Sequence, residues 1–130
     1  MSAEAPTSAC RVLIADDTPD IRFLLRRALD GDPRFEVVDE AADGAEAVRM
    51  VASHLPDAIL LDLAMPVMDG LQAIPEILRT APNTKIVVLS GFDASSMSKE
   101  ALDRGAHAYL EKGASILEIT TLLAGFCPAA

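Results

Sequence analysis

The chain has 130 residues, a length that suits one domain with a substantial core. Its residues are 51% hydrophobic but only 4% aromatic, which excludes a disordered chain and predicts an aliphatic core. The net charge of −9 excludes a domain that itself grips nucleic acid or an anionic membrane, because both need a basic face. This charge favours a protein that binds cations or presents an acidic surface to a basic partner.

The ends of the chain bear on its location in the cell. The first nine residues lack the apolar segment of a signal peptide, and no apolar run reaches membrane-spanning length. We therefore expect a cytoplasmic protein without a membrane partner. The two cysteines, Cys10 and Cys127, lie near opposite ends. In the cytoplasm we expect both to be reduced and partly buried, and a disulfide between them is the less favoured alternative.

Five short apolar segments alternate with segments of helical character. The strand-like segments are residues 11–15, 35–39, 58–61, 85–89 and 107–110. The first four are rich in Val, Ile or Leu, as buried strands are. This alternation predicts βαβ units, so we expect an α/β fold with a parallel five-stranded sheet between two helical layers.

The first two helices carry start signals. Thr18 is a preferred N-cap, and Pro19 suits the first helical position. Leu24 belongs to the apolar face that we expect to pack on the sheet. Asp43 and Glu46 have the spacing of a capping box at the start of the second helix.

The other three helices differ in strength. The third covers residues 71–80 and contains Pro75, which donates no hydrogen bond, so we expect a late start or kinked first turns. The fourth, residues 95–104, is rich in serine and weakly apolar, which is typical of a low-stability element. Ser115 begins a capping box for the last helix, whose buried face is predicted to include Ile116.

Polar side chains follow four of the strands at the point where each ends. Asp16 and Asp17 follow the first, Asp62 the third and Ser90 the fourth, and Lys112 comes one residue after the fifth. Parallel strands end at the same edge of a sheet, and ligands bind in the crevice outside their carboxyl ends. The spacing therefore predicts three carboxylates, a hydroxyl and an ammonium around one crevice.

The three carboxylates predict a cation site. Held together in a partly dry pocket, they repel one another and raise their own pKa values, so they need positive charge. Lys112 supplies one unit, and oxygen-only ligands favour a hard ion, Mg²⁺ (or Mn²⁺), that shares its shell with a phosphate. The alternative for a single aspartate is a turn or a helix N-cap, which stays open for Asp17 and is preferred for Asp43, Asp69 and Asp93.

Four segments of the chain together resemble the receiver domains of bacterial two-component response regulators. They are the acid pair after Ala15, the run DLAMPVMDG at 62–70, Leu89-Ser90-Gly91, and the run GAHAYLEK at 105–112. Their order and spacing make the resemblance specific. It implies the flavodoxin-like (βα)5 three-layer sandwich with strand order 2-1-3-4-5. The chain then divides into a flexible N-terminal tail, a receiver domain and a C-terminal tail, which are residues 1–9, 10–127 and 128–130.

The resemblance also implies a role for each site residue. Asp62 would accept a phosphoryl group from a phosphohistidine on a sensor histidine kinase or phosphotransfer protein. The metal ligands would be Asp16, Asp17, Asp62 and the backbone carbonyl of Ala64. Lys112 would pair with the phosphate, and Ser90 would hydrogen-bond to it. The chain would be a signalling switch that assists its own phosphoryl transfer and dephosphorylation, and not an enzyme acting on a separate substrate.

Phosphorylation would change one surface of such a domain. With Ser90 drawn to the phosphate, Tyr109 would turn inward, and segments 95–104 and 107–110 and the helix after Ser115 would present a changed face. The alternative for Tyr109 is a half-buried ring with a hydrated hydroxyl. The partners expected at this face are an output domain, a target protein or a second copy of the chain, with no direct contact to nucleic acid.

One departure from the family pattern lies at Lys112, which precedes Gly113 where most relatives have a proline with a cis bond. A cis bond before glycine costs ~2.5–4 kcal/mol, so we expect a trans bond and a less firmly positioned Lys112 ammonium.

Two other functions compete with the phosphorylated switch. The intact acid set disfavours a receiver-like binding module that is not phosphorylated. The acidic loop at 16–20, which would repel a phosphate without a metal, disfavours a flavin-binding electron carrier of similar fold.

Overall fold

The computed structural model describes residues 9–91 and 95–128. Residues 1–8 of the predicted tail at 1–9, residues 92–94 with Asp93, and residues 129–130 lie outside this part. Strands and helices alternate along the chain, as predicted. They are β1 (Cys10–Ala15), α1 (Pro19–Asp30), β2 (Phe35–Ala41), α2 (Gly44–His54), β3 (Ala58–Leu61), α3 (Gly70–Thr80), β4 (Lys85–Ser90), α4 (Ser95–Asp103), β5 (Ala108–Glu111) and α5 (Ile116–Phe126).

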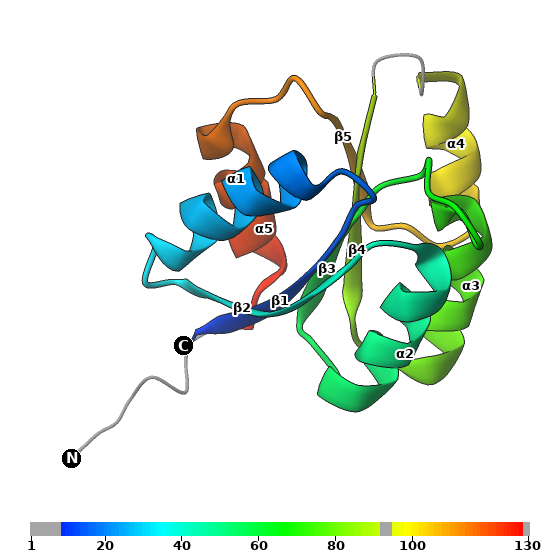
Figure 1. Ribbon diagram of the computed structural model, residues 1–130, viewed down its shortest axis with the longest axis horizontal. Helices are drawn as coiled ribbons and strands as arrows, with labels where there is room; N and C mark the ends of the chain where they lie inside the picture. Colours follow the sequence, from blue (N-terminus) through cyan, green and yellow to red (C-terminus); the bar gives the residue numbers. More distant parts are fainter. Residues whose placement is uncertain (1–8, 92–94, 129–130) are drawn as a thin grey trace.

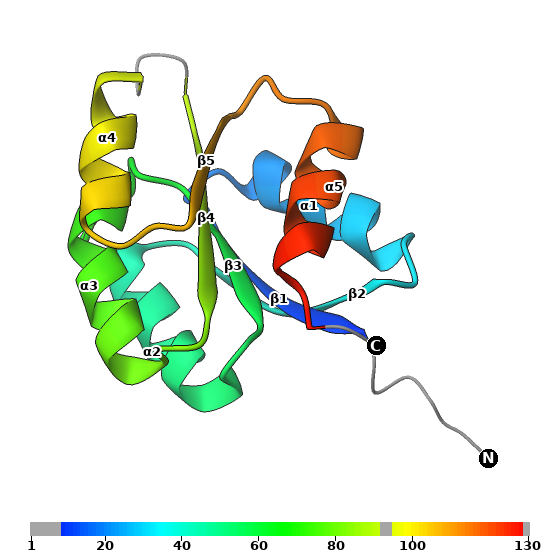
Figure 2. The same cartoon turned by 180° about the vertical axis from the view of Figure 1, so that it is seen from behind.

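The strands form one parallel sheet in the order β2-β1-β3-β4-β5. Helices α1 and α5 cover one face, and α2, α3 and α4 cover the other (Figures 1 and 2). The predicted α/β sandwich and its strand order are therefore confirmed. In the part of the chain that the structure describes, no helix has both the length and the hydropathy needed to span a membrane.

The strand side chains divide between two aliphatic cores. Ile59 and Leu61 of β3 point to the face covered by α2, α3 and α4, whereas Ala58 and Leu60 point to the face covered by α1 and α5. All four are buried because β3 is sandwiched between two helical layers. A strand buried on both faces needs a continuous apolar run, and the segment AILL supplies one.

Side chains cap three of the helices as the sequence predicts. Asp69 and Gln72 form a capping box on α3, and Ser115 begins the same arrangement on α5. Asp43 accepts a hydrogen bond from the backbone N–H of Glu46 at 2.8 Å and so caps α2. The predicted capping box is not completed there, because the Glu46 carboxylate accepts from the N–H of Ala42 at 2.7 Å and not from that of Asp43. The cap interpretation of Asp43 and Asp69 therefore agrees with the structure.

Helix α3 contains Pro75 without the late start expected from the sequence, since it begins at Gly70. A proline at this position leaves the carbonyl of Leu71 without its usual helical donor. The Arg104 guanidinium, just after α4, donates to that carbonyl at 3.1 Å. This long-range bond replaces the one that the proline removes, which the local sequence could not reveal.

Two side chains predicted to be buried are exposed. Leu24 on α1 is 61% exposed and Ile116 on α5 is 47% exposed. Each of these helices packs on the sheet through a narrower stripe than the apolar pattern indicates, centred on Leu25 and Leu29 in α1 and on Ile119 and Leu123 in α5. These helices therefore present apolar surface that the sheet does not cover.

The two cysteines form a disulfide, so the expectation of free thiols is wrong for this structure. Cys10 opens β1, and Cys127 follows α5, which packs on the same face of the sheet as α1. Their Cα atoms are 5.5 Å apart, within the range that a disulfide needs, although 117 positions separate them in the sequence. The fold brings together residues that the sequence places at opposite ends.

Candidate metal centre at the carboxyl edge of the sheet

Backbone hydrogen bonds fix the two strand exits that carry the central carboxylates. The N–H of Asp62 donates to the carbonyl of Ala15 at 2.9 Å, and the N–H of Asp16 donates to the carbonyl of Ala41 at 3.0 Å. Sheet pairing thus extends to the acidic residues themselves. Asp16 and Asp62 are each only 2% exposed, whereas the neighbouring Asp17 is exposed.

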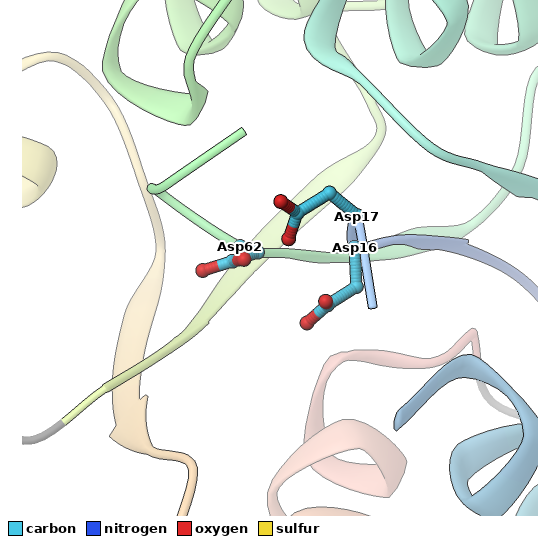
Figure 3. A group of neighbouring side chains, drawn as sticks. All are labelled: Asp16, Asp17 and Asp62. Carbon is cyan, nitrogen blue, oxygen red and sulfur yellow. The ribbon is translucent and has the colours of Figure 1, made fainter. Parts of the chain in front are cut away.

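The three predicted carboxylates lie together. Asp16, Asp17 and Asp62 each offer one carboxylate oxygen, and these oxygens all lie within 4.8 Å of one another. Their side chains extend from the adjacent ends of β1 and β3 (Figure 3). A cluster of oxygen donors at this spacing is the kind of site that a hard divalent cation prefers.

Lys112 is the cation of the cluster. Its Nζ lies 3.0 Å from Oδ2 of Asp16 and 3.1 Å from Oδ2 of Asp62. Burial acts to lower the pKa of Lys112, but the bonds to these two carboxylates outweigh it and raise the pKa. Its backbone N–H also donates to the carbonyl of Ser90 at 2.6 Å. The bond to Gly113 is trans, as predicted. The Lys112 ammonium is nevertheless held toward Asp16 and Asp62 by these contacts.

The net charge of the cluster around Asp62 remains negative. Burial is the main cause that raises the pKa of Asp62, and the charge of Asp16 raises it further. The contacts from Lys112 and from the Ala64 N–H, at 3.2 Å, act in the opposite direction but do not cancel the rise. Three carboxylates against one ammonium leave excess negative charge, so the residues present fit a divalent cation.

Two glycines allow the loop after Asp62 to approach its neighbours closely. A Cβ on Gly70 would lie 2.3 Å from the carbonyl oxygen of Asp62, and one on Gly44 would lie 2.1 Å from that of Met68. The Gly44 N–H donates to the same Met68 carbonyl at 2.9 Å. This packing role was not predicted, and the only signal for it in the sequence was a glycine at the start of each helix.

Ser90 and Tyr109 lie on the neighbouring strands β4 and β5. Ser90 is 3% exposed. The half-buried Tyr109 ring packs against the core on the α2–α4 side, and among the described residues its hydroxyl is the only buried side-chain polar atom without a hydrogen-bond partner. Burial raises the pKa of Tyr109; Ser90 is close enough to act in the opposite direction, but without the geometry of a hydrogen bond. The hydroxyl is therefore already turned away from solvent in this structure, and not hydrated.

Arg22 was not predicted as part of the site. Its guanidinium donates to the backbone carbonyl of Asp16 at 2.6 Å. The only sequence signal was an arginine in the first turn of the helix that follows the acid pair. Thr18 begins that helix but makes no side-chain cap, and its backbone N–H donates to Oδ1 of Asp16 at 2.9 Å.

Comparison with known proteins agrees with this geometry. The family model for the response regulator receiver domain matches residues 12–124. A protein-glutamate methylesterase/protein-glutamine glutaminase of Rhodospirillum centenum is 42% identical over 85% of this chain, which spans 28% of that protein. The transcriptional regulatory protein LiaR of Bacillus subtilis is 39% identical over 84% of this chain and 52% of its own length.

A solved structure extends the comparison. The receiver domain of AraT, a response regulator from Geobacillus stearothermophilus, superposes with a TM-score of 0.83 at 34% sequence identity. The similarity covers 91% of this chain and 92% of that one.

An acidic cluster at the carboxyl edge of a 2-1-3-4-5 sheet, with a lysine between its carboxylates, is the arrangement of a phosphorylatable signalling domain. The chain belongs to the response regulator receiver domain family. Phosphorylation on an aspartate and Mg²⁺ binding at the acidic pocket are typical of this family. The chain is thus a receiver domain of two-component signalling, and the unphosphorylated binding module is not favoured. The match of residues 12–124 to this family also disfavours the flavin carrier.

Proposed function

We propose that Asp62 is the phosphoryl acceptor of this receiver. The observation that carries the proposal is the position of its carboxylate, which is buried, bonded to Lys112 at 3.1 Å and grouped with two further carboxylates. A carboxylate becomes an effective nucleophile when its charge is managed and its partner is positioned. Asp62 has both conditions, because Lys112 and the neighbouring loop hold it in place.

The donor we propose is a phosphohistidine of a sensor histidine kinase or phosphotransfer protein. A carboxylate oxygen of Asp62 forms the new P–O bond while the P–N bond to the imidazole breaks, and the bonding electron pair leaves with the imidazole nitrogen. Lys112 would then pair with a phosphate oxygen, and Ser90 would hydrogen-bond to another. Phosphoryl transfer depends mostly on such positioning and charge neutralisation.

We propose Asp16, Asp17 and Asp62 as the carboxylate ligands of Mg²⁺, with the backbone carbonyl of Ala64 as a further ligand and Mn²⁺ as an alternative ion. Bound there, the ion would supply positive charge to the transferring phosphoryl group. The clustering of the three carboxylate oxygens supports this assignment, as does the N–H of Ala64 bonded to Asp62.

The switch we propose couples Ser90 to Tyr109. The Tyr109 hydroxyl is buried without a hydrogen-bond partner beside Ser90, and such an orphaned group destabilises the state that contains it. Movement of Ser90 toward a phosphate would change the surroundings of this hydroxyl and bias the surface made by α4, β5 and α5. That surface would serve an output domain, a target protein or a second copy of the chain.

We propose that the phosphodonor docks on apolar side chains near the start of two helices at this edge of the sheet. Phe23 and Leu24 on α1 are 57% and 61% exposed, and Ile116 and Leu117 on α5 are 47% and 73% exposed. Helices α1 and α5 lie side by side, so these side chains can form one surface (Figures 1 and 2).

We propose a cytoplasmic location, with residues 10–127 as the receiver domain and residues 1–9 and 128–130 as its tails.

The test is the intact mass of the protein after incubation with acetyl phosphate, with and without Mg²⁺. We expect one phosphoryl adduct that requires Mg²⁺, survives acid and is lost in base. Asp62→Asn should abolish it, because the amide cannot act as the nucleophile. The control is Asp69→Asn, which changes a half-buried aspartate in the same loop and retains a good N-cap.

The outcomes separate the alternatives. An adduct that persists in Asp62→Asn would show that another residue accepts the phosphoryl group. No adduct in the wild-type protein under any condition would favour the binding module.

A further inference from the structure

Arg22 connects the acid pair to the edge strand of the sheet. Its guanidinium donates to the backbone carbonyl of Asp16 at 2.6 Å and, through Nε, to Oε1 of Glu40 at 3.2 Å. Glu40 lies on β2 and also accepts from Arg26, so both of its carboxylate oxygens are occupied. The Arg22 side chain is only 18% exposed. Neither the proposed transfer nor the proposed metal ligands use this arginine.

The contact completes a set of donors that fix Asp16 at three atoms. Lys112, just after β5, holds Oδ2 at 3.0 Å, the Thr18 N–H holds Oδ1 at 2.9 Å, and Arg22 on α1 holds the carbonyl oxygen. The carbonyl contact is the one that fixes the peptide between Asp16 and Asp17. The orientation of that peptide sets where both carboxylates lie relative to Asp62.

We propose that Arg22 is a positioning residue of the metal centre, which holds the Asp16–Asp17 peptide so that both carboxylates face the same cation as Asp62. The inference rests on the proposed function of these carboxylates. A guanidinium suits the task because its planar fork can bond to a carbonyl and a carboxylate at once. The compact ammonium of a lysine does not offer the same fork.

The direction in which Mg²⁺ affinity changes when Arg22 is replaced distinguishes a positioning role from an effect of its charge alone. A cation close to a metal site repels the metal, so an arginine that acted only through its charge would weaken Mg²⁺ binding, and its removal would tighten it. An arginine that positions the ligands has the opposite effect. Residues that orient metal ligands typically change affinity by about 10–100-fold when replaced.

The experiment is calorimetric titration of the full chain with Mg²⁺. We expect Arg22→Gln to weaken Mg²⁺ binding by about tenfold. Arg22→Lys keeps the charge but not the fork, so we expect a smaller loss in the same direction. The control is Arg27→Gln on the same helix, whose exposed side chain lies over the Phe23 ring, and which should bind Mg²⁺ as the wild type does.

A second readout follows the geometry directly. In amide NMR spectra of the metal-free proteins, Arg22→Gln and Arg22→Lys should shift the Asp17 amide resonance, which Arg27→Gln should leave in place. Unchanged or tighter Mg²⁺ binding in Arg22→Gln would overturn the inference, and if that variant did not fold, wild-type affinity in Arg22→Lys would do so. A wild-type chain that binds no Mg²⁺ would instead overturn the proposed metal site on which the inference rests.

Discussion

The ion pairs of Lys112 show why we expect single substitutions at this site to have large effects on stability. Asp16 and Asp62 are both 2% exposed, and a buried carboxylate without a counter-charge is strongly destabilising. The ammonium of Lys112 lies between them, at 3.0 and 3.1 Å. A divalent cation at the same cluster would compensate the same charges. We therefore expect that a bound cation can partly replace Lys112 in stabilising the fold.

We predict that Lys112→Met lowers the free energy of unfolding of the metal-free protein by roughly 3 kcal/mol, because it leaves two buried carboxylates uncompensated. Saturating Mg²⁺ should stabilise this variant more than it stabilises the wild type. Urea unfolding with and without Mg²⁺ measures both effects.

The matched control for this prediction is Lys99→Met, which removes an exposed ion pair with Asp103 on α4 and should change little. If metal-free Lys112→Met were as stable as the wild type, the carboxylates would not depend on the lysine.

At the scale of elements, β5 is an edge strand joined to β4 at its start by His107. The His107 N–H donates to the carbonyl of Ile86 at 2.8 Å, and the Ile86 N–H donates to Nδ1 of His107 at 3.0 Å. The second bond requires an unprotonated Nδ1, so the neutral imidazole is the form that holds the strands together. Burial, followed by the charge of Lys85, lowers the pKa of His107 below 6.5.

This lowered pKa predicts a pH dependence of stability. Between the folded pKa and 6.5 the unfolded chain binds more protons at His107 than the folded chain does. The free energy of unfolding should therefore fall as the pH decreases through that window. His107→Gln cannot titrate but retains an acceptor for Ile86, so its stability should fall less steeply.

The measurement is urea unfolding of both proteins at a series of pH values from neutral to mildly acidic. Subtracting the His107→Gln profile from that of the wild type isolates His107 from the other groups that titrate there. Parallel profiles would show that His107 does not contribute.

At the scale of the whole molecule, the disulfide joins the first strand to the end of the last helix. Cys10 is 1% exposed, and the bond closes a loop across 117 positions, almost the whole chain. A cross-link over so long a loop restricts the unfolded ensemble strongly. It also ties α5, an element of the proposed output surface, to the start of β1, an inner strand of the sheet. Disulfides are rare in reducing compartments, so this link depends on the redox state around the protein.

We predict that Cys127→Ser lowers the free energy of unfolding by about 2–5 kcal/mol relative to the oxidised wild type. A thiol reductant should lower the stability of the wild type toward that of the variant and leave the variant unchanged. Thermal unfolding of both proteins, with and without reductant, measures this. A wild type whose unfolding temperature does not respond to reductant would contradict the prediction.

The order of the elements, the aliphatic sandwich and the gathering of Asp16, Asp17 and Asp62 could all be predicted from the sequence. These follow from local patterns and from one general rule, since strand periodicity locates the exits and parallel strands share an edge. The caps at Asp69 and Ser115 were predictable for the same reason, because a cap involves residues only three positions apart.

Contacts between residues that are distant in the sequence could not be predicted in this way. The pairing of Cys10 with Cys127, the donation from Arg104 to the Leu71 carbonyl and the contact of Arg22 with Asp16 each depend on how elements pack, which sequence spacing does not encode. The exposure of Leu24 was decided in the same way, because apolar periodicity marks the side of a helix that faces the sheet but not the width of the stripe that the sheet covers.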